Sequence, residues 1–214
     1  SLFSRFDVSE NTTFIHGTTV ATNALLEDDL ADVLLVTNEG LEGILAIGRG
    51  GRRELYNLNP NPKDYPFTDW PVVGVTLRDH PFLDDPGFLS EREAARLRNE
   101  IREYDPDHVA ICLVHSYRDD RQELAVETAL DPLDCPVTRS SAITPRFREF
   151  ERAGNVVLNT GLTPLISEYL NQIENSTPAP GTTRIMGSAR GTMDTAEAVR
   201  RPLRTALSGP TGGL

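Results

Sequence analysis

Residues 108–116 read HVAICLVHS, an apolar run that ends in two polar side chains. The six consecutive apolar residues 109–114 are typical of a strand that is buried on both faces of a parallel sheet. Such a sheet needs helices on both sides, and ligands bind beyond the carboxyl ends of its strands. The run therefore predicts an α/β protein, and it also indicates where a site would lie.

The rest of the chain alternates between strand-length apolar runs and helical patterns, which favours the same fold class. The other predicted strands are 12–15, 32–37, 72–77, 136–141 and 182–188. The predicted helices are 18–27, 38–47, 90–104, 118–130 and 145–174. Gly161 and Pro164 are expected to break or kink the last helix. Ser90 is expected to cap the helix 90–104, with Glu93 at the spacing of a capping box.

The composition indicates a soluble globular protein, because 38% of the residues are hydrophobic and 25% are charged. The net charge of -11 argues against a nucleic-acid partner, since no basic stripe is present to displace counterions. No apolar run approaches the ~20 residues that span a membrane, and no leader is recognised, so we expect a cytoplasmic protein. Lys63 is the only lysine, and an acidic surface poor in lysine suggests a halophilic source.

The two cysteines, Cys112 and Cys135, have neither a disulfide framework nor a metal-ligand spacing. Cys112 lies inside the apolar run 109–114 and is expected to be a buried structural thiol. The residues therefore predict no metal site.

Residues 14–27, FIHGTTVATNALLE, place an imidazole, a glycine and two hydroxyls where a strand meets a helix. One interpretation is a tight turn at Gly17 with Thr18 or Thr19 capping the helix. The other is a ligand site, because a helix N-terminus attracts anions and His16 can act as an acid or base near neutral pH. In a parallel sheet this junction shares the carboxyl edge with three other polar stretches, 37–39, 115–117 and 187–188.

Three further features remain open between a structural and a functional interpretation. His115 and Ser116 end the buried run, but no Gly-x-Ser-x-Gly elbow is present to support a Ser-His-Asp triad. The glycine-rich stretch 208–214, SGPTGGL, matches neither a P-loop nor Gly-x-Gly-x-x-Gly. The stretch 49–53, RGGRR, either holds a carboxylate or phosphate or is a solvated or inter-subunit loop.

Five blocks in order resemble the hydantoinase A / 5-oxoprolinase family. They are HGTTVATNALLE (16–27), TNEGLEGILAIGRGGRRELYNL (37–58), VAICLVHSYRDDRQE (109–123), SSAITPRFREFER (140–152) and RPLRTALSGPTGGL (201–214). The resemblance implies an actin-like ATPase / sugar-kinase fold, in which two ribonuclease-H-like halves clasp ATP. Residues 1–207 would be a first half-domain, incomplete at both ends and lacking its first phosphate-binding hairpin. Residues 208–214 would start the crossover to the second half.

The resemblance also implies an activity. Members hydrolyse cyclic amides such as hydantoin, N-methylhydantoin or 5-oxoproline at the expense of ATP, with Mg²⁺ offsetting the phosphoryl charge. We expect ATP and Mg²⁺ in the intact parent and no cofactor in this fragment, which would be inactive alone. The expected partners are a small cyclic amide and a hydantoinase B-type subunit or fused domain, with no nucleic acid and no membrane.

The family pattern places two groups of residues at the site. The predicted catalytic residues, facing the interdomain cleft, are His16, Thr18, Thr19, Asn23, His115 and Ser116. The predicted cofactor-binding residues, beside the nucleotide, are Gly17, Ser208, Gly209, Pro210, Gly212 and Gly213. The chain departs from the family at Ala153, Gly154 and Ala189, which are not expected to have polar roles.

Two alternatives are kept. In the first, the parent is a subunit of an ATP-dependent acetone- or acetophenone-type carboxylase, which shares the ATP step. A third interpretation, from another class, is a non-catalytic binding or assembly module that retains the fold.

Overall fold

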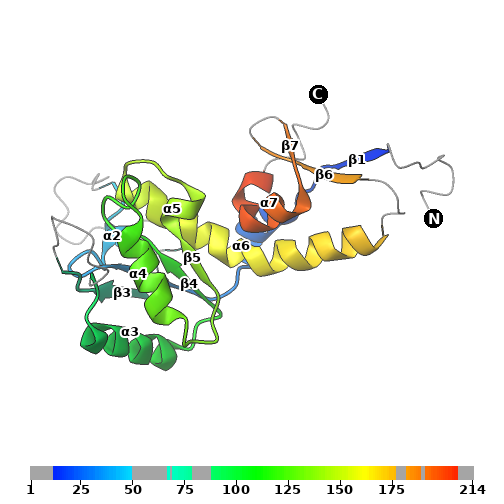
Figure 1. Ribbon diagram of the computed structural model, residues 1–214. Coiled ribbons are helices and arrows are strands. Elements are labelled where there is room, and N and C mark those ends of the chain that lie inside the picture. The colour runs from blue at the N-terminus through cyan, green and yellow to red at the C-terminus, as the bar shows by residue number, and fades with distance from the viewer. Residues whose placement is uncertain are drawn as a thin grey trace. The chain divides into compact units, whose positions relative to one another are not determined.

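The computed structural model describes residues 12–49, 67, 69–78, 88–176, 182–188 and 191–206, and the chain divides into two compact units. Residues 31–161 form one of them, which we call the inserted unit because it interrupts the other. The split unit combines residues 1–30 with 162–214. A single long helix, α6 (Glu149–Ser176), begins in the inserted unit and ends in the split unit (Figure 1).

The inserted unit is built on a four-stranded sheet in which every neighbouring pair is parallel, in the order β3-β2-β4-β5. The strands are Val33–Asn38 (β2), Val72–Val75 (β3), His108–Ile111 (β4) and Val137–Arg139 (β5). This confirms the prediction of a parallel sheet with the run 108–116 at its centre.

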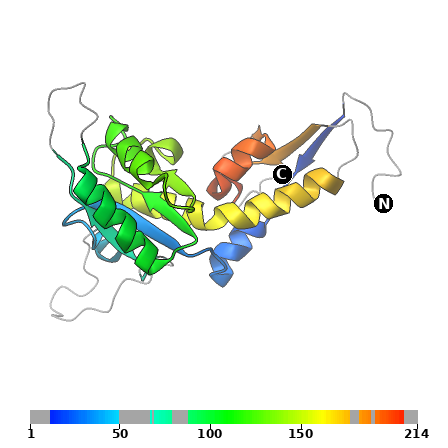
Figure 2. The same ribbon diagram turned by 60° about the horizontal axis from the view of Figure 1, so that its bottom comes forward.

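Each face of this sheet carries its own hydrophobic core. Val109 and Ile111 of β4 pack into one core, and the alternating residues Ala110 and Cys112 pack into the other; all four are at most 2% exposed. Helices α3 (Glu91–Tyr104) and α4 (Arg121–Leu130) supply the first core. The second is covered by α2 (Ile44–Ile47), α5 (Ser140–Ile143) and the first half of α6 (Figure 2). The central run is therefore buried on both faces, as predicted.

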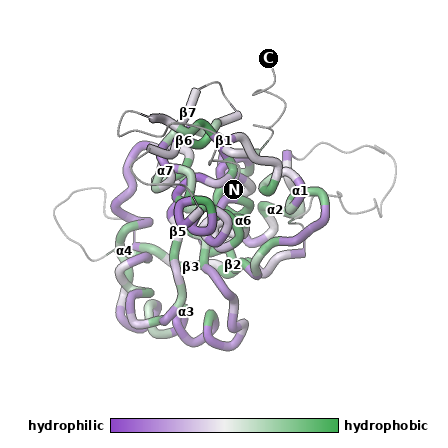
Figure 3. The backbone as a smooth tube through the Cα atoms, turned by 90° about the vertical axis from the view of Figure 1, so that its right-hand side faces the viewer, coloured by the Kyte–Doolittle hydropathy of each residue, from purple (hydrophilic) through white to green (hydrophobic). Residues whose placement is uncertain are grey.

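Helix α3 is amphipathic, with Ala94, Leu97 and Ile101 buried on one side. Figure 3 shows this helix as largely hydrophilic, in contrast to the hydrophobic colours along β2. The Ser90 hydroxyl accepts a hydrogen bond from the Glu93 amide at 3.2 Å, which confirms the predicted N-cap. In a capping box the Glu93 side chain would in turn accept from the Ser90 amide. Here the Glu93 carboxylate accepts instead from the Thr76 amide, at 3.0 Å. Glu93 thus joins α3 to the end of β3.

The split unit contains a smaller, mixed sheet. Strand β6 (Thr182–Met186) lies between β1 (Thr13–His16), which is parallel to it, and β7 (Thr192–Met193), which is antiparallel. Helix α1 (Val20–Glu27), the second half of α6, α7 (Thr195–Arg200) and the 3₁₀ turn Pro202–Thr205 complete it. Their core is made of small and aliphatic side chains: Ala21, Ala24, Leu162, Ile166, Leu170, Ile185 and Ala198. The two-residue strand β7 is too short to leave an alternating pattern and was not predicted.

Several predicted elements are shorter than expected, and the predicted helix 38–47 and strand 108–116 lose the most residues. The predicted strand 136–141 forms only over Val137–Arg139, since Ser140 begins α5. The helix expected over 38–47 forms only over Ile44–Ile47, because Gly40 adopts a positive φ of 84° and turns the chain first. Strand β4 ends at Ile111 and not at 116. Beyond Cys112 the backbone amides of Leu113 and Val114 donate to side chains, Glu123 and Asn38, and no longer to a neighbouring strand.

The break expected at Gly161 and Pro164 does not occur, and α6 is continuous over 28 residues. A proline removes one backbone donor and disfavours a helix interior by about 3 kcal/mol. Leu162, Ile166 and Leu170 are buried on either side of it, and this packing offsets the loss. Within the described residues, none of the helices has the length and apolarity needed to cross a membrane.

The Ser90 cap generates a stability prediction. Ser90→Ala should lower the free energy of unfolding by about 1 kcal/mol, because the Glu93 amide loses its acceptor. Ser90→Asp should retain most of the stability, since a carboxylate can accept the same bond. Urea unfolding of the three proteins measures this, and equal midpoints for Ser90→Ala and wild type would contradict the cap.

Candidate functional site

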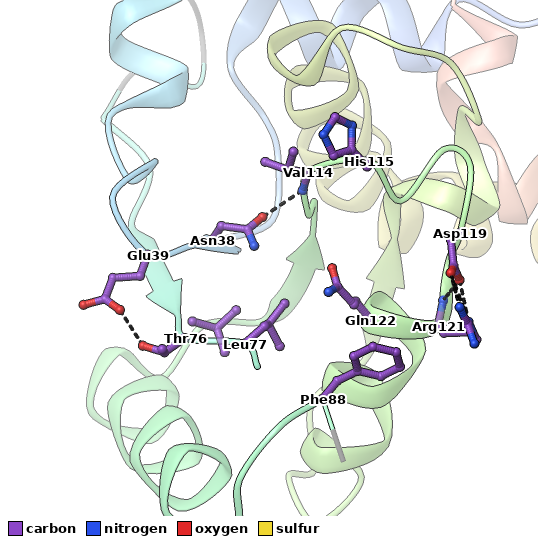
Figure 4. Close-up of a pocket in the computed structure, with 11 residues that line it drawn as sticks. Asn38, Glu39, Thr76, Leu77, Phe88, Val114, His115, Asp119, Arg121 and Gln122 are labelled. Atoms are coloured by element: carbon purple, nitrogen blue, oxygen red, sulfur yellow. Dashed lines mark hydrogen bonds and ion pairs between the residues drawn. The ribbon is translucent and has the colours of Figure 1, made fainter. Parts of the chain in front are cut away.

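A pocket of about 500 Å³ lies in the inserted unit, where β2, β3 and β4 end (Figure 4). Amide, imidazole, carboxylate and guanidinium groups share its wall with aliphatic side chains and one phenyl ring. The lining residues are Asn38, Glu39, Val75, Thr76, Leu77, Phe88, Val114, His115, Asp119, Arg121 and Gln122.

The strand order explains why the pocket forms at this point. From β2 the chain moves to β3 on one side, and it then crosses to β4 on the other side. The carboxyl ends of β2 and β4 therefore flank a topological switch point, the usual ligand position in an open parallel sheet. Asn38 closes β2, and its Oδ1 accepts from the Val114 amide at 2.8 Å (Figure 4). This bond fixes the ends of β2 and β4, and it leaves the side-chain NH₂ of Asn38 to act as a donor.

The charged groups of the pocket are paired. Glu39 Oε2 lies 2.5 Å from the Thr76 hydroxyl, which donates to it. Arg121 Nε donates to both carboxylate oxygens of Asp119, at 2.9 and 3.0 Å. These hydrogen bonds hold the pKa of Asp119 below its ordinary value. The Arg121 guanidinium also lies 5.8 Å from the centre of the Phe88 ring. The pocket thus offers ordered donors and acceptors beside an apolar surface.

His115 is exposed at this edge. Its backbone has a φ of 62°, in the left-handed region that non-glycine residues rarely adopt. Its ring packs edge-on against Tyr117, with 6.3 Å between the ring centres. The structure therefore brings His115 together with residues 38 and 39, as the carboxyl-edge argument predicted. That prediction was wrong for residues 16–19 and 187–188, because β1 and β6 belong to a second sheet.

Ser116, in contrast, is only 3% exposed. Its hydroxyl lies 2.6 Å from Glu123 Oε1 and 2.8 Å from the Leu113 carbonyl, and it accepts from Arg152 Nη2 at 2.8 Å. The hydroxyl has one hydrogen, which it donates to Glu123 or to the Leu113 carbonyl, and it accepts from Arg152. It is therefore satisfied inside the protein, which favours a structural role. Its catalytic role stays a prediction.

Two buried charged residues behind the pocket were missed. Glu123 is fully buried and Arg152 is 1% exposed. Glu123 shares the inner face of α4 with Val126 and Leu130, at helical spacing. A carboxylate among the apolar positions of a helix indicates a buried charge, and the sequence contains this signal at Glu123. Arg152 gives the same signal in α6, because it is adjacent to Ala153 and one turn from Val156, which are both in the core.

The other predicted residues lie at the β1–α1 junction of the split unit. His16 Nε2 and the Tyr169 hydroxyl share a hydrogen bond of 2.6 Å. The Val20 amide donates to the Thr18 hydroxyl at 3.1 Å, whereas Thr19, the N-cap residue of α1, makes no side-chain cap bond. The exposed positions at this junction are Gly17, Thr19 and Asn23. Thr18 thus satisfies one helix amide from the position before the N-cap, and a ligand role for these residues stays a prediction.

Some predicted positions lie outside the described residues: Ser208, Gly209, Pro210, Gly212 and Gly213, together with Arg52 and Arg53. Arg49 forms an ion pair with Glu151 at 2.7 Å, which accounts for its charge. Across the part of the chain that the structure describes, no three His, Cys, Asp or Glu side chains gather in a way that could hold a metal ion. Cys112 is buried as predicted, and this burial raises the pKa of its thiol.

Comparison with known families gives two matches in chain order. Residues 4–132 match the hydantoinase/oxoprolinase N-terminal region, and residues 152–214 match the hydantoinase/oxoprolinase domain that follows it. The 5-oxoprolinase of Saccharomyces cerevisiae is 29% identical over 239 residues, covering 97% of this chain and 18% of the yeast protein. Caprolactamase subunit alpha of Pseudomonas jessenii is 29% identical over 168 residues, covering 75% of this chain and 24% of that subunit.

Two solved structures share the fold. The ATP-dependent caprolactamase from Pseudomonas jessenii has a TM-score of 0.69 at 26% identity and covers 92% of this chain. A nucleotide-free acetone carboxylase has a TM-score of 0.70 over 94% of this chain, but at 22% identity this likeness is one of fold alone. These structures confirm the predicted α/β fold class. The chain spans 29% and 30% of the two solved chains.

The His16–Tyr169 pair generates a pH prediction. Burial lowers the pKa of His16 below 6.5, so the folded protein binds this proton less readily than the unfolded chain does. His16 therefore contributes stability that is present above pH 6.5 and is lost as the pH falls through the folded pKa.

An NMR titration of the histidine rings should give a midpoint below 6.5 for His16, identified by the signal missing in His16→Gln. Tyr169→Phe keeps the aromatic ring and removes the hydroxyl, and it serves as the matched variant for the hydrogen bond. A His16 midpoint at or above 6.5 would show that the ring is solvated and would contradict the packing described.

Proposed function

The chain belongs to the hydantoinase/oxoprolinase family, and we propose that it is part of a longer ATP-dependent enzyme that opens the ring of a cyclic amide. The substrates we propose are a hydantoin, N-methylhydantoin or 5-oxoproline. The observation that carries this proposal is the pair of family matches, which follow one another over almost the whole chain. The names of two relatives, 5-oxoprolinase and caprolactamase, support the substrate class.

The pocket of the inserted unit supports a small polar ligand. The amide group of such a ring presents an N–H donor beside a C=O acceptor. The carboxamides of Asn38 and Gln122 can offer both hydrogen-bonding senses, and Phe88 offers an apolar surface. We propose that this pocket recognises the ring, with His115 as a further hydrogen-bonding group.

We propose a different role for the turn in the split unit. ATP, when bound, supplies a phosphoryl group that converts the amide oxygen into a leaving group. The exposed backbone at Gly17 and the start of α1 fit an anion, and residues 208–213 would complete the nucleotide site. Burial lowers the pKa of His16, and the neutral imidazole can accept a proton. The described residues offer no metal cluster, so we assign no ligand to Mg²⁺.

The carboxylase alternative receives support from the fold alone, through acetone carboxylase at 22% identity. Bicarbonate separates the two activities, because a carboxylase needs it for ATP turnover and an amidase does not. A non-catalytic module would release no ADP with any of these substrates.

We further propose a hydantoinase B-type subunit or fused domain as partner, which the name of the caprolactamase alpha subunit supports. A cytoplasmic location follows from the proposed use of ATP. The net charge of -11 and the single lysine support a halophilic source and argue against a nucleic-acid partner.

His16→Ala in the full-length protein should reduce cyclic-amide-dependent ATP hydrolysis by about 10²-fold or more, the usual contribution of a general base. His108→Ala is the matched control, since His108 lies at the amino end of β4, opposite the site edge. Its activity should match wild type. ADP release measures both, and unchanged activity in a folded His16→Ala protein would remove His16 from the site.

His115→Ala should instead raise KM for the cyclic amide by about tenfold with a smaller change in kcat, because it removes a binding group. Steady-state kinetics with varied amide at saturating ATP measures this. If kcat falls and KM is unchanged, the pocket does not act in ring recognition.

A further inference from the structure

A buried hydrogen-bond network lies directly behind the turn that carries His115. The Glu123 carboxylate accepts from four donors: the Leu113 amide (3.1 Å), the Ser116 hydroxyl (2.6 Å), the Ser140 hydroxyl (2.6 Å) and the Ser141 amide (2.9 Å). These donors all lie in the turn after β4 and at the start of α5. The burial of this carboxylate is therefore balanced by hydrogen bonds.

Arg152 holds the same turn from α6. Its Nη2 donates to the Leu113 carbonyl and, at 2.8 Å, to the Ser116 hydroxyl. Its guanidinium carbon lies 5.7 Å from the centre of the Tyr117 ring, the ring against which His115 packs. Among the described residues, the Nε and Nη1 atoms of Arg152 have no hydrogen-bond partner although they are buried. A charged side chain buried with two unused donors needs a reason beyond stability.

Glu123 and Arg152 bind both ends of the segment 113–116. Leu113 is bound through its amide by Glu123 and through its carbonyl by Arg152. Ser116 contacts both charged groups through one hydroxyl. Between these fixed points lies His115, in the left-handed conformation. A non-glycine residue stays in that region only when its surroundings impose it.

We propose that Glu123 and Arg152 are positioning residues, which hold residues 113–116 so that the His115 imidazole faces the pocket. Neither side chain lines the pocket. They act through His115, and Ser116 is the link that carries both contacts. In this proposal Ser116 supports the site, and His115 contacts the ligand.

Hydrogen exchange of the full-length protein tests the network without any substrate. Glu123→Gln places an NH₂ group against donors, so the amides of Leu113 and Ser116 should exchange about tenfold faster than in wild type. Glu127→Gln is the matched control: it lies one turn later on α4 and pairs with Arg139 at 2.6 Å. Its exchange at 113–116 should equal that of wild type. Unchanged exchange in Glu123→Gln overturns the proposal.

Where Glu123→Gln fails to fold, Ser140→Ala removes a single donor and should give a smaller increase at the same amides. Arg152→Gln provides the test from the other side, with Arg148→Gln, an exposed arginine one turn earlier, as its control. Faster exchange over the whole inserted unit in Ser140→Ala and Arg152→Gln, with no excess at 113–116, would mean general destabilisation and would overturn the proposal.

The kinetic test rests on the proposed function. If Glu123 acts only through His115, the double variant Glu123→Gln, His115→Ala should have the same kcat/KM for the cyclic amide as His115→Ala alone. Losses that multiply overturn the positioning role. If the wild-type protein shows no amide-dependent ATP hydrolysis, the proposed function fails, and hydrogen exchange alone then decides whether the network holds the turn.

Discussion

Burial of β4 on both faces is the constraint on which the inserted unit depends. Val109 and Ile111 face one core and Ala110 and Cys112 face the other, so the strand has no solvent side. Helices must then cover both faces of the sheet, and the strands are joined as parallel neighbours. Polar side chains are excluded from the strand itself and can leave the core only where it ends. The pocket at the carboxyl edge is a consequence of this arrangement.

The end of β4 shows how such an edge is stabilised. The amides of Leu113 and Val114 no longer meet a neighbouring strand, and a buried donor without a partner costs about 1–3 kcal/mol. Glu123 and Asn38 provide the missing acceptors. The groups that satisfy the backbone are thus the groups that shape the pocket, so stability and the geometry of the site are linked. The edge cannot be changed at Glu123 without an effect on the turn that carries His115.

Much of the fold could be predicted from sequence because it depends on local patterns. The buried run, the Ser90 cap and the position of His115 each follow from a few adjacent residues. Other features depend on contacts between distant segments. The insertion of residues 31–161 between the two parts of the split unit leaves no sequence signal. Glu123 was assigned only to a helix, because its four donors come from the turn after β4 and from α5. Gly161 and Pro164 were expected to break or kink α6, since the packing that offsets the proline is tertiary.

Isotope transfer tests the central claim, that the whole protein activates a cyclic amide by moving a phosphoryl group onto its carbonyl oxygen. In the labelled substrate, 5-oxoproline or hydantoin carries ¹⁸O at the ring carbonyl that is hydrolysed. That oxygen attacks the γ-phosphorus as ADP leaves, and one water adds to the carbon, so that the C–N bond opens and leaves an acyl phosphate. A second water attacks the same carbon, and phosphate departs with the label. Mass spectrometry should find ¹⁸O in inorganic phosphate, with one ADP per opened ring. Label retained wholly in the product carboxylate, or ring opening without ADP, would contradict the account.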